Sequence, residues 1–305
     1  VSFALGVNSG SYLGPAVVRT DAAGEARAPG WTVGTVRTAG SSLRASSRGL
    51  AGDPADFQAI LQAGPPVGWA YAFGPTTGVV NEITPEPPIV GIADRYGNRV
   101  PDLPLEWTIT AGGGTLVQAD SMTNSLGDGA AVWRLGTRAA LNRLILKTPA
   151  LPGDSIRYET LGVPGPPDTV VAIVGDGQSA AVRRALPVSP TVLVTDQYGN
   201  PAPGVVVVFT VLSGGGTLSA GGGRLTDGGG QASPGVWTLG PTRGTQTVRA
   251  RSGNPFGPQP EVIFSATAVQ PAAANLISLG GSGQTVRAGA PSPVPVAVRI
   301  LDSLG

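Results

Sequence analysis

The sequence feature that most constrains the fold is an internal repeat with a period of about 100 residues. A complete copy carries an aromatic residue in a long apolar run, a tryptophan in a W-x-[LV]-G element and an aspartate in a turn. These landmarks are Phe3, Trp107 and Phe209; Trp31, Trp133 and Trp237; and Asp94, Asp196 and Asp302. Because three independent landmarks recur at nearly the same interval, we predict that the 305 residues form several copies of one module rather than one large core.

The composition favours β-structure for each copy. The chain holds 47 Gly and 29 Pro, a content that indicates disorder when it has no pattern. Here these residues stand at turn positions between apolar runs that alternate with period two, such as Val1, Phe3 and Leu5. This pattern is typical of short strands joined by tight turns. A unit of about 100 residues is also the size of an immunoglobulin-like sandwich.

The repeat divides the chain into the rear part of one module, two whole modules and the front part of a fourth. These four parts are residues 1–63, 64–164, 165–270 and 271–305. We therefore expect an all-β chain of tandem immunoglobulin-like β-sandwich domains, with partial domains at both chain ends. Both whole modules open on Gly-Pro-Pro, at 64–66 and 165–167, which predicts short, stiff linkers.

The charge balance and the missing residue types argue against several function classes. Charged residues make up 13% of the chain and the net charge is +1, which gives no electrostatic basis for binding nucleic acid. The chain has no His and no Cys, the commonest general base and the thiol nucleophile. No apolar run reaches the ~18 residues that span a bilayer. We expect no enzyme activity and no catalytic, cofactor-binding or metal-binding residues, and no membrane insertion of this segment.

The recurring aspartate turns have two interpretations. Carboxylate and carbonyl oxygens are calcium ligands, but each turn offers a single certain carboxylate. The same residues fit an Asx turn, in which the aspartate accepts backbone hydrogen bonds while Gly or Asn adopts a left-handed conformation. The sequence favours the turn. The Gly-Gly-Gly tracts are likewise predicted to be turns rather than phosphate loops, since no Lys or helix start follows them: 112–114, 214–216 and 221–223.

Three aromatic residues do not recur: Trp69, Tyr71 and Phe73. At period two they would share one face of the first strand of their module, where the next module has Val170, Ala172 and Val174. One interpretation is a bulkier local core. The alternative is a contact surface for a neighbouring chain or a sugar, because rigid aromatic side chains dominate binding energetics.

The combined motifs D-x-Y-G-N-x-x-P, V-x-F, G-G-G-T-L, T-D-x-x-G-x-A and W-x-L-G resemble the bacterial Ig-like group 1 (Big-1) repeats of invasin- and intimin-type proteins. The third unit carries nearly all of them: Asp196, Tyr198, Gly199, Asn200, Pro203, Phe209, Gly214–Leu218, Thr226, Asp227, Gly230, Ala232, Trp237 and Gly240. The second unit departs at Asn124 and at Gly127–Asp128. The resemblance implies a secreted or surface-exposed tandem-Ig protein, located outside the cell, whose modules serve mainly as stalks.

The resulting expectation is a non-enzymatic extracellular stalk or fibre of a bacterial surface. The phase of the repeat adds a finer hypothesis, because the last unit consists of the strands that the first unit lacks. The tail of one chain could complete the head of the next and build a head-to-tail filament by strand complementation. Alternatively, the repeats continue within one long polypeptide. The other class considered is an adhesin binding module for a host receptor or a surface glycan.

Overall fold

The computed structural model describes residues 1–28, 30–253 and 259–302, and its regular structure is almost entirely β. Within these residues the elements are twenty-five strands and one 3-10 helix, η1 (Arg37–Ala39). The prediction of an all-β fold is therefore confirmed. The chain divides into two compact units, Val1–Val163 and Pro164–Gly305, and each is described by itself.

The first unit begins with the N-terminal segment, which comprises β1–β5 and η1. Three of its strands form an antiparallel sheet in the order β1-β4-β5, and two form a short ribbon. Their bounds are β1 (Ser2–Leu5), β2 (Ser11–Tyr12), β3 (Trp31–Thr32), β4 (Ser41–Ser46) and β5 (Ala55–Ala59). Phe3 and Leu43 are buried on the apolar face of the three-stranded sheet, whereas Phe57, which pairs with Leu43, is 53% exposed. This face is only partly covered.

Module 2 (β6–β13) completes the first unit as a two-sheet sandwich. One sheet has the order β10-β11-β8-β6 and the other β7-β13-β12-β9. Strands of the first sheet are β6 (Pro66–Phe73), β8 (Ile89–Asp94), β10 (Thr115–Ala119) and β11 (Asp128–Arg134). Those of the second are β7 (Thr77–Val79), β9 (Glu106–Ala111), β12 (Leu141–Lys147) and β13 (Ile156–Val163). β7 pairs with β13 in parallel, so the chain changes sheets after β6.

The core of module 2 forms between its two sheets because apolar side chains alternate along the strands. Val90 and Ile92 of β8 face Leu144 and Leu146 of β12, with Trp133 of β11 among them. All five are fully buried. The pattern is clearest in β11, where buried and half-buried residues alternate over its whole length.

Module 3 (β14–β23) opens the second unit with the same plan. Its first sheet has the order β14-β16-β20, its second β15-β23-β22-β17-β19, and β18 pairs with β21. The bounds are β14 (Thr169–Val174), β15 (Gln178–Ala181), β16 (Thr191–Thr195), β17 (Val206–Val211), β18 (Thr217–Leu218), β19 (Gly222–Leu225), β20 (Gln231–Ala232), β21 (Trp237–Thr238), β22 (Gly244–Ser252) and β23 (Glu261–Val269). β15 pairs with β23 in parallel, as β7 does with β13.

The two repeated tryptophans have equivalent surroundings. Trp133 pairs with Leu116, and Trp237 pairs with Leu218. Both indoles are fully buried, each in its own core. The tryptophans that mark the sequence repeat therefore occupy equivalent positions in modules 2 and 3.

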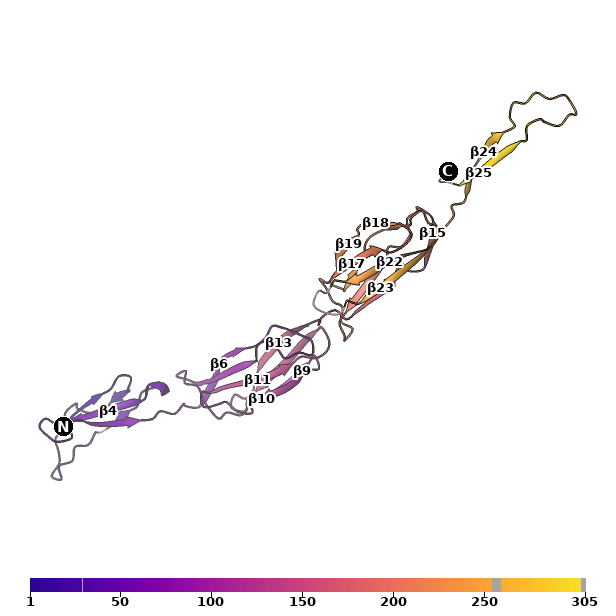
Figure 1. The fold of residues 1–305 in the computed structure, drawn as a ribbon. Helices are drawn as coiled ribbons and strands as arrows, with labels where there is room; N and C mark the ends of the chain where they lie inside the picture. The colour runs from indigo at the N-terminus through magenta and orange to yellow at the C-terminus, as the bar shows by residue number, and fades with distance from the viewer. Residues whose placement is uncertain (29, 254–258, 303–305) are drawn as a thin grey trace. The chain divides into compact units, whose positions relative to one another are not determined.

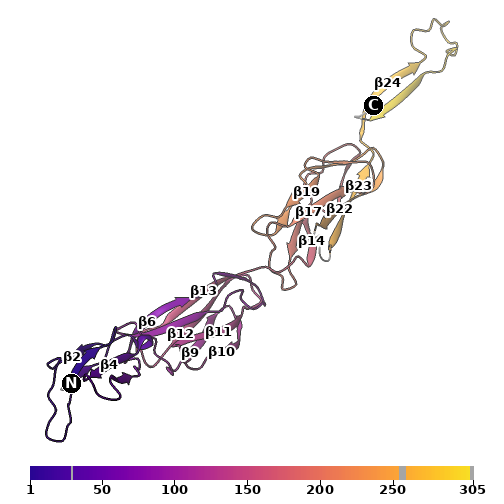
Figure 2. The same ribbon diagram turned by 60° about the vertical axis from the view of Figure 1, so that its left-hand side comes forward.

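The second unit ends in the C-terminal hairpin, β24 (Ala273–Gly280) and β25 (Ala297–Asp302). Leu276 pairs with Ile300, as Val170 pairs with Val194 in module 3. Val170 and Val194 are buried, whereas Leu276 and Ile300 are 66% and 67% exposed. Both views show the hairpin as a two-stranded ribbon, with no second sheet packed on it among the described residues (Figures 1 and 2).

Candidate functional site

The unrepeated aromatic residues lie on β6, an edge strand of its sheet. Trp69 pairs with Ile92, but Tyr71 pairs with the next residue of β8, Gly91. This β-bulge inserts one residue into β6, so the residues after it change faces. Trp69 consequently packs against the core of module 2. The prediction that all three rings share one face was wrong for Trp69, because period two holds only along an unbulged strand.

Tyr71 and Phe73 lie together on the opposite, outer face of the sheet. Their rings are stacked, with centroids 5.5 Å apart and planes at 22°. Phe73 is 64% exposed. The guanidinium carbon of Arg99 lies 4.3 Å from the centroid of the Tyr71 ring, and Arg99 forms an ion pair with Asp128. We call Tyr71, Phe73, Arg99 and Asp128 the outer cluster.

Gly91 makes room for the outer cluster. A Cβ at this position would lie 2.6 Å from both the Tyr71 ring and Arg99 Nη1. Burial, followed by hydrogen bonding with Asp128, raises the pKa of Tyr71. Since the ordinary pKa of this phenol is 10.0, it stays neutral at physiological pH. The cluster therefore presents two neutral rings beside an ion pair.

Module 3 builds the same sheet without these side chains. By strand register, Val171 and Leu193 take the places of Tyr71 and Gly91, and Gln231 that of Asp128. Pro201 occupies the position of Arg99. The fold thus does not require the cluster, which makes it a candidate contact surface. Arg99 and Asp128 were not predicted to be site residues. The sequence signals that could have identified them are the departure from the repeat pattern at Asp128 and, at Arg99, an arginine where module 3 has proline.

The recurring aspartate turns are held by the carboxylate. Asp94 Oδ1 accepts the N–H groups of Tyr96 and Asn98 at 2.8 and 2.9 Å. Asp94 Oδ2 accepts Gly64 N–H at 2.8 Å and Asn98 Nδ2–H at 2.9 Å. Gly97 adopts a left-handed φ of 82°. These contacts are those of the predicted Asx turn, with a further bond to the linker.

Asp196 repeats this arrangement in module 3. Its carboxylate accepts the N–H groups of Tyr198, Asn200 and Gly165 and the side-chain amide of Asn200. The turn that follows Asp302 falls on residues 303–305, outside the described residues. No group of three or more acidic side chains that could hold a metal ion occurs within residues 1–28, 30–253 and 259–302.

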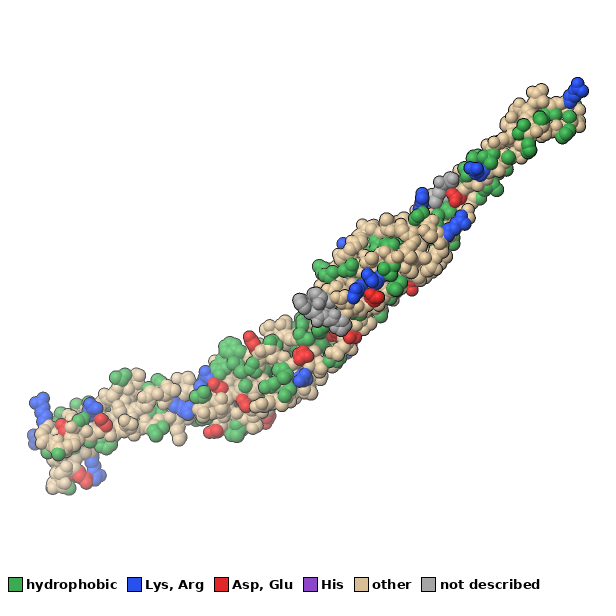
Figure 3. All heavy atoms as spheres, viewed as in Figure 1, with side chains coloured by type: hydrophobic (Ala, Val, Ile, Leu, Met, Phe, Trp, Pro, Cys, Tyr) green, Lys and Arg blue, Asp and Glu red, His purple; other side chains and the backbone are tan. Residues whose placement is uncertain are grey.

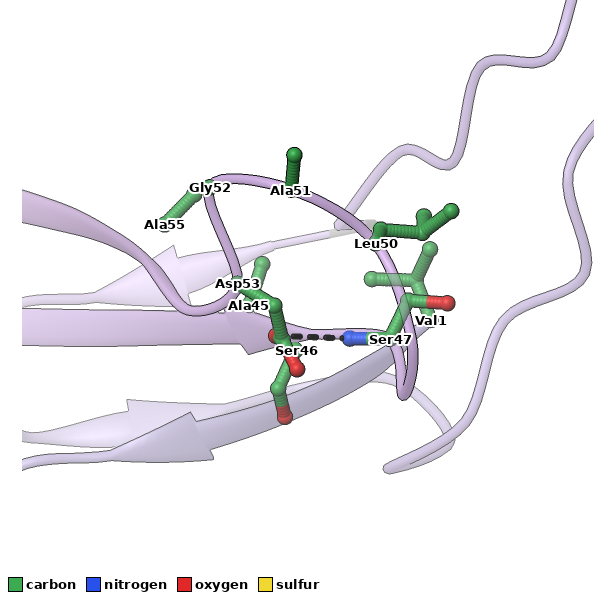
Figure 4. Close-up of a pocket in the computed structure, with 9 residues that line it drawn as sticks. All are labelled: Val1, Ala45, Ser46, Ser47, Leu50, Ala51, Gly52, Asp53 and Ala55. Carbon is green, nitrogen blue, oxygen red and sulfur yellow. Dashed lines mark hydrogen bonds between the residues drawn. The ribbon is translucent and has the colours of Figure 1, made fainter.

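A small hollow of about 170 Å³ lies beside the N-terminal sheet (Figure 4). Its lining is mostly small and apolar, including Ala45, Leu50 and Ala55. The carboxylate of Asp53 accepts Ser47 N–H at 2.9 Å, which closes the loop. The Asp53 carboxylate in its lining thus serves the loop's own main chain.

Neither sign of charge dominates the face that Figure 3 shows. Figure 3 shows acidic and basic side chains interspersed among hydrophobic ones on the face in view, in keeping with the net charge of +1. The described residues hold no helix of the length and apolarity that a membrane crossing needs.

Comparisons with known proteins give fold likeness. No family model and no curated protein matches the sequence. The solved structure of FdeC, an Escherichia coli adhesin, superimposes with a TM-score of 0.55 at 17% identity, over 88% of this chain and 86% of that one. Invasin, a bacterial integrin-binding protein, gives 0.48 at 11% identity, over 79% of this chain and 48% of that one. The D0-D1 domains of intimin give 0.25 at 20% identity, over 63% of this chain and 95% of that one.

The likeness to FdeC covers most of both chains, and at this identity it establishes the fold. The expected resemblance to tandem repeats of the invasin and intimin type is thus confirmed at that level: the chain is a tandem immunoglobulin-like protein that shares its fold with a bacterial adhesin.

Proposed function

We propose that this chain is a chemically inert segment of a bacterial surface stalk, which sets the distance between the cell and an adhesive tip. The observation that carries the proposal is that modules 2 and 3 each close a core of their own, with no residue shared between the cores. Such modules add length without adding a reaction site. The fold likeness to an adhesin supports an extracellular location.

Surface labelling tests this function. Intact bacteria that produce the native protein are treated with an antibody raised against the 305-residue chain. We expect labelling of intact cells and its loss after brief external proteolysis. Labelling that requires lysis would contradict the proposal. As a control, an antibody to a cytoplasmic protein should label lysed cells alone.

The finer proposal is that chains assemble head to tail by strand complementation. The C-terminal hairpin exposes Ile300 where module 3 buries Val194, and the N-terminal sheet exposes Phe57 where module 3 buries Phe264. In module 3 these two faces cover each other. A second copy therefore offers each face the kind of sheet that covers it in the complete module.

Sizing of the 305-residue chain over a range of concentrations tests this assembly. We expect mass to rise with concentration, and Ile300→Asp to abolish the rise because it places a charge on the apolar face. Arg287→Asp, on the exposed loop of the same hairpin, is the matched control. A persistent monomer at all concentrations would rule out complementation between chains.

The outer cluster supports a second candidate function, adhesion to a host receptor or a surface glycan. Phe73 and Tyr71 present stacked rings on an edge strand, a geometry suited to aromatic contacts. The double variant Tyr71→Ala, Phe73→Ala should lower binding on a glycan or receptor array while the module stays folded. Val117→Ala, which removes an exposed apolar side chain on β10, the opposite edge strand of the same sheet, is the control. An array without any signal for the unaltered chain would argue against adhesion by this segment.

A further inference from the structure

The Asp94 turn of module 2 contacts the chain segment that precedes the module. Asn98 Oδ1 accepts Arg37 N–H at 2.8 Å, and Asn98 Nδ2–H donates to Thr35 O at 2.8 Å. Arg37 is the first residue of η1 in the N-terminal segment. One side-chain amide therefore holds two main-chain groups of the preceding segment.

On the basis of the proposed stalk function, we propose that the Asp-x-Tyr-Gly-Asn turn of module 2 is a joint that fixes the angle between the N-terminal segment and module 2. Asn98 holds the preceding segment. Asp94 holds the linker, since its Oδ2 accepts Gly64 N–H, and it also holds Asn98 through the Nδ2–H group. Linker, turn and preceding segment thus form one hydrogen-bonded unit.

Three other turns of the same form have no asparagine at the position that Asn98 occupies. Asp21, Asn124 and Asp227 cap turns of the same form, each accepting the N–H groups two and four residues later. The fourth residue after the cap in these turns is Glu25, Asp128 and Gln231. Since only the main chain of that residue serves the turn, no asparagine is needed for it.

Among the turns of this form that the structure describes, asparagine occupies that position in the two that also bind a linker glycine. These are the turn of Asp94 with Gly64 and the turn of Asp196 with Gly165. In both, the asparagine side chain donates to the aspartate carboxylate. Asparagine at this position thus accompanies the hydrogen bond to the linker glycine rather than the turn itself. At Asn98 the side-chain amide also forms hydrogen bonds with the preceding segment.

The main-chain contacts carry this joint more than the Arg37 guanidinium does. Arg37 Nη1 lies 3.5 Å from Arg99 O and 3.4 Å from Ser125 O, which is long for an N–H···O bond. The two Asn98 bonds are 2.8 Å. Loss of the Arg37 N–H should therefore loosen the joint more than loss of the Arg37 side chain.

Distances between two spin labels on the full chain test the joint. The chain has no cysteine, so Arg48→Cys in the N-terminal segment and Lys147→Cys in module 2 place the labels uniquely. Asn98→Ala removes the two side-chain hydrogen bonds to the preceding segment and leaves the main-chain bonds to Asp94 Oδ1. Arg37→Pro removes the N–H donor: proline suits the first helical position, and Val36, with φ −97° and ψ 105°, suits the residue before it.

We expect a narrow distance distribution whose width roughly doubles in Asn98→Ala and in Arg37→Pro, because unrestrained modules move independently. Arg37→Ala and Asp21→Ala keep both hydrogen bonds of the Asn98 side chain to the preceding segment, so they should leave the width unchanged. A broad distribution in the unaltered chain, or an unchanged width in both test variants, would overturn the proposal. Amide exchange in β11 verifies that module 2 remains folded, and surface labelling of cells, measured separately, reports on the stalk function.

Discussion

At the residue scale, the repeated tryptophans Trp133 and Trp237 are the largest fully buried side chains of modules 2 and 3. Trp133 is fully buried among Val90, Ile92 and Leu144. Its indole Nε1 has no hydrogen-bond partner among the described residues, so packing rather than hydrogen bonding holds the ring. The cost of removing it is therefore the loss of apolar burial and the cavity that remains.

Trp133→Ala should destabilise module 2 by about 3–5 kcal/mol. Because a chain of several modules does not unfold in one step, amide exchange resolved by segment is the suitable measurement. Protection should fall in β8, β11 and β12, whereas Leu126→Ala, at an exposed site, should change it by less than about 0.5 kcal/mol. A loss below 1 kcal/mol for Trp133→Ala would mean that the tryptophan does not organise the core.

Because Asp94 holds the joint as a carboxylate, we predict that the joint loses stability at acid pH. Burial of Asp94 raises its pKa, but the hydrogen bonds from Asn98, Gly64 and Tyr96 outweigh burial and leave the pKa below its ordinary value of 3.8. The stability that these bonds provide is present above that pH and is lost as the pH falls through the folded-state pKa.

Amide exchange at Tyr96 and Asn98 measures this loss of stability at acid pH. Protection should be constant from pH 7 to about pH 4 and should decrease below it. Asp94→Asn removes the titrating group, so its protection should be lower at neutral pH and independent of pH in the acid range. Equal acid sensitivity in the two proteins would show that another group controls the turn.

At the element scale, the sequence predicted strands and turns well because period-two alternation and glycine turns are local signals. Trp107 and Trp133, two of the residues that define the repeat, lie on β9 and β11 and contact the core of module 2. The bulge in β6 was not predictable in the same way, since the inserted residue is apolar and fits either face. The informative signal lay on another strand: Gly91, which lacks the side chain that would otherwise occupy the outer face.

Gly91→Val tests this relation between neighbouring strands. Its Cβ would lie 2.6 Å from the Tyr71 ring, so the ring and Arg99 must move. We expect a destabilisation of about 1–3 kcal/mol and a change in tyrosine environment by NMR. Gly68→Val on β6 is the control, because no heavy atom lies within 4 Å of a Cβ there. Equal effects of the two substitutions would contradict the assignment of Gly91 as the space for Tyr71.

At the scale of the whole molecule, the repeat predicted modules but not what covers the outer ones. The apolar faces of the N-terminal sheet and the C-terminal hairpin carry the same kinds of residue as the corresponding faces of module 3. Such faces pack equally well against strands of the same chain or of another copy, so their sequence cannot distinguish the two. The cores of modules 2 and 3, by contrast, are each closed by residues of one module alone.

Separate cores predict separate unfolding. Phe264 is fully buried in the core of module 3, and Phe264→Ala should destabilise that module by about 3–5 kcal/mol. The protection of β8, β11 and β12 in module 2 should change by less than about 0.5 kcal/mol, because distant sites without shared partners act additively. Exchange measured on the full chain reports both modules in one sample, so each serves as the control for the other. A matching loss of protection in module 2 would mean that the modules fold as one cooperative body, and stability would then depend on the joints as much as on the cores.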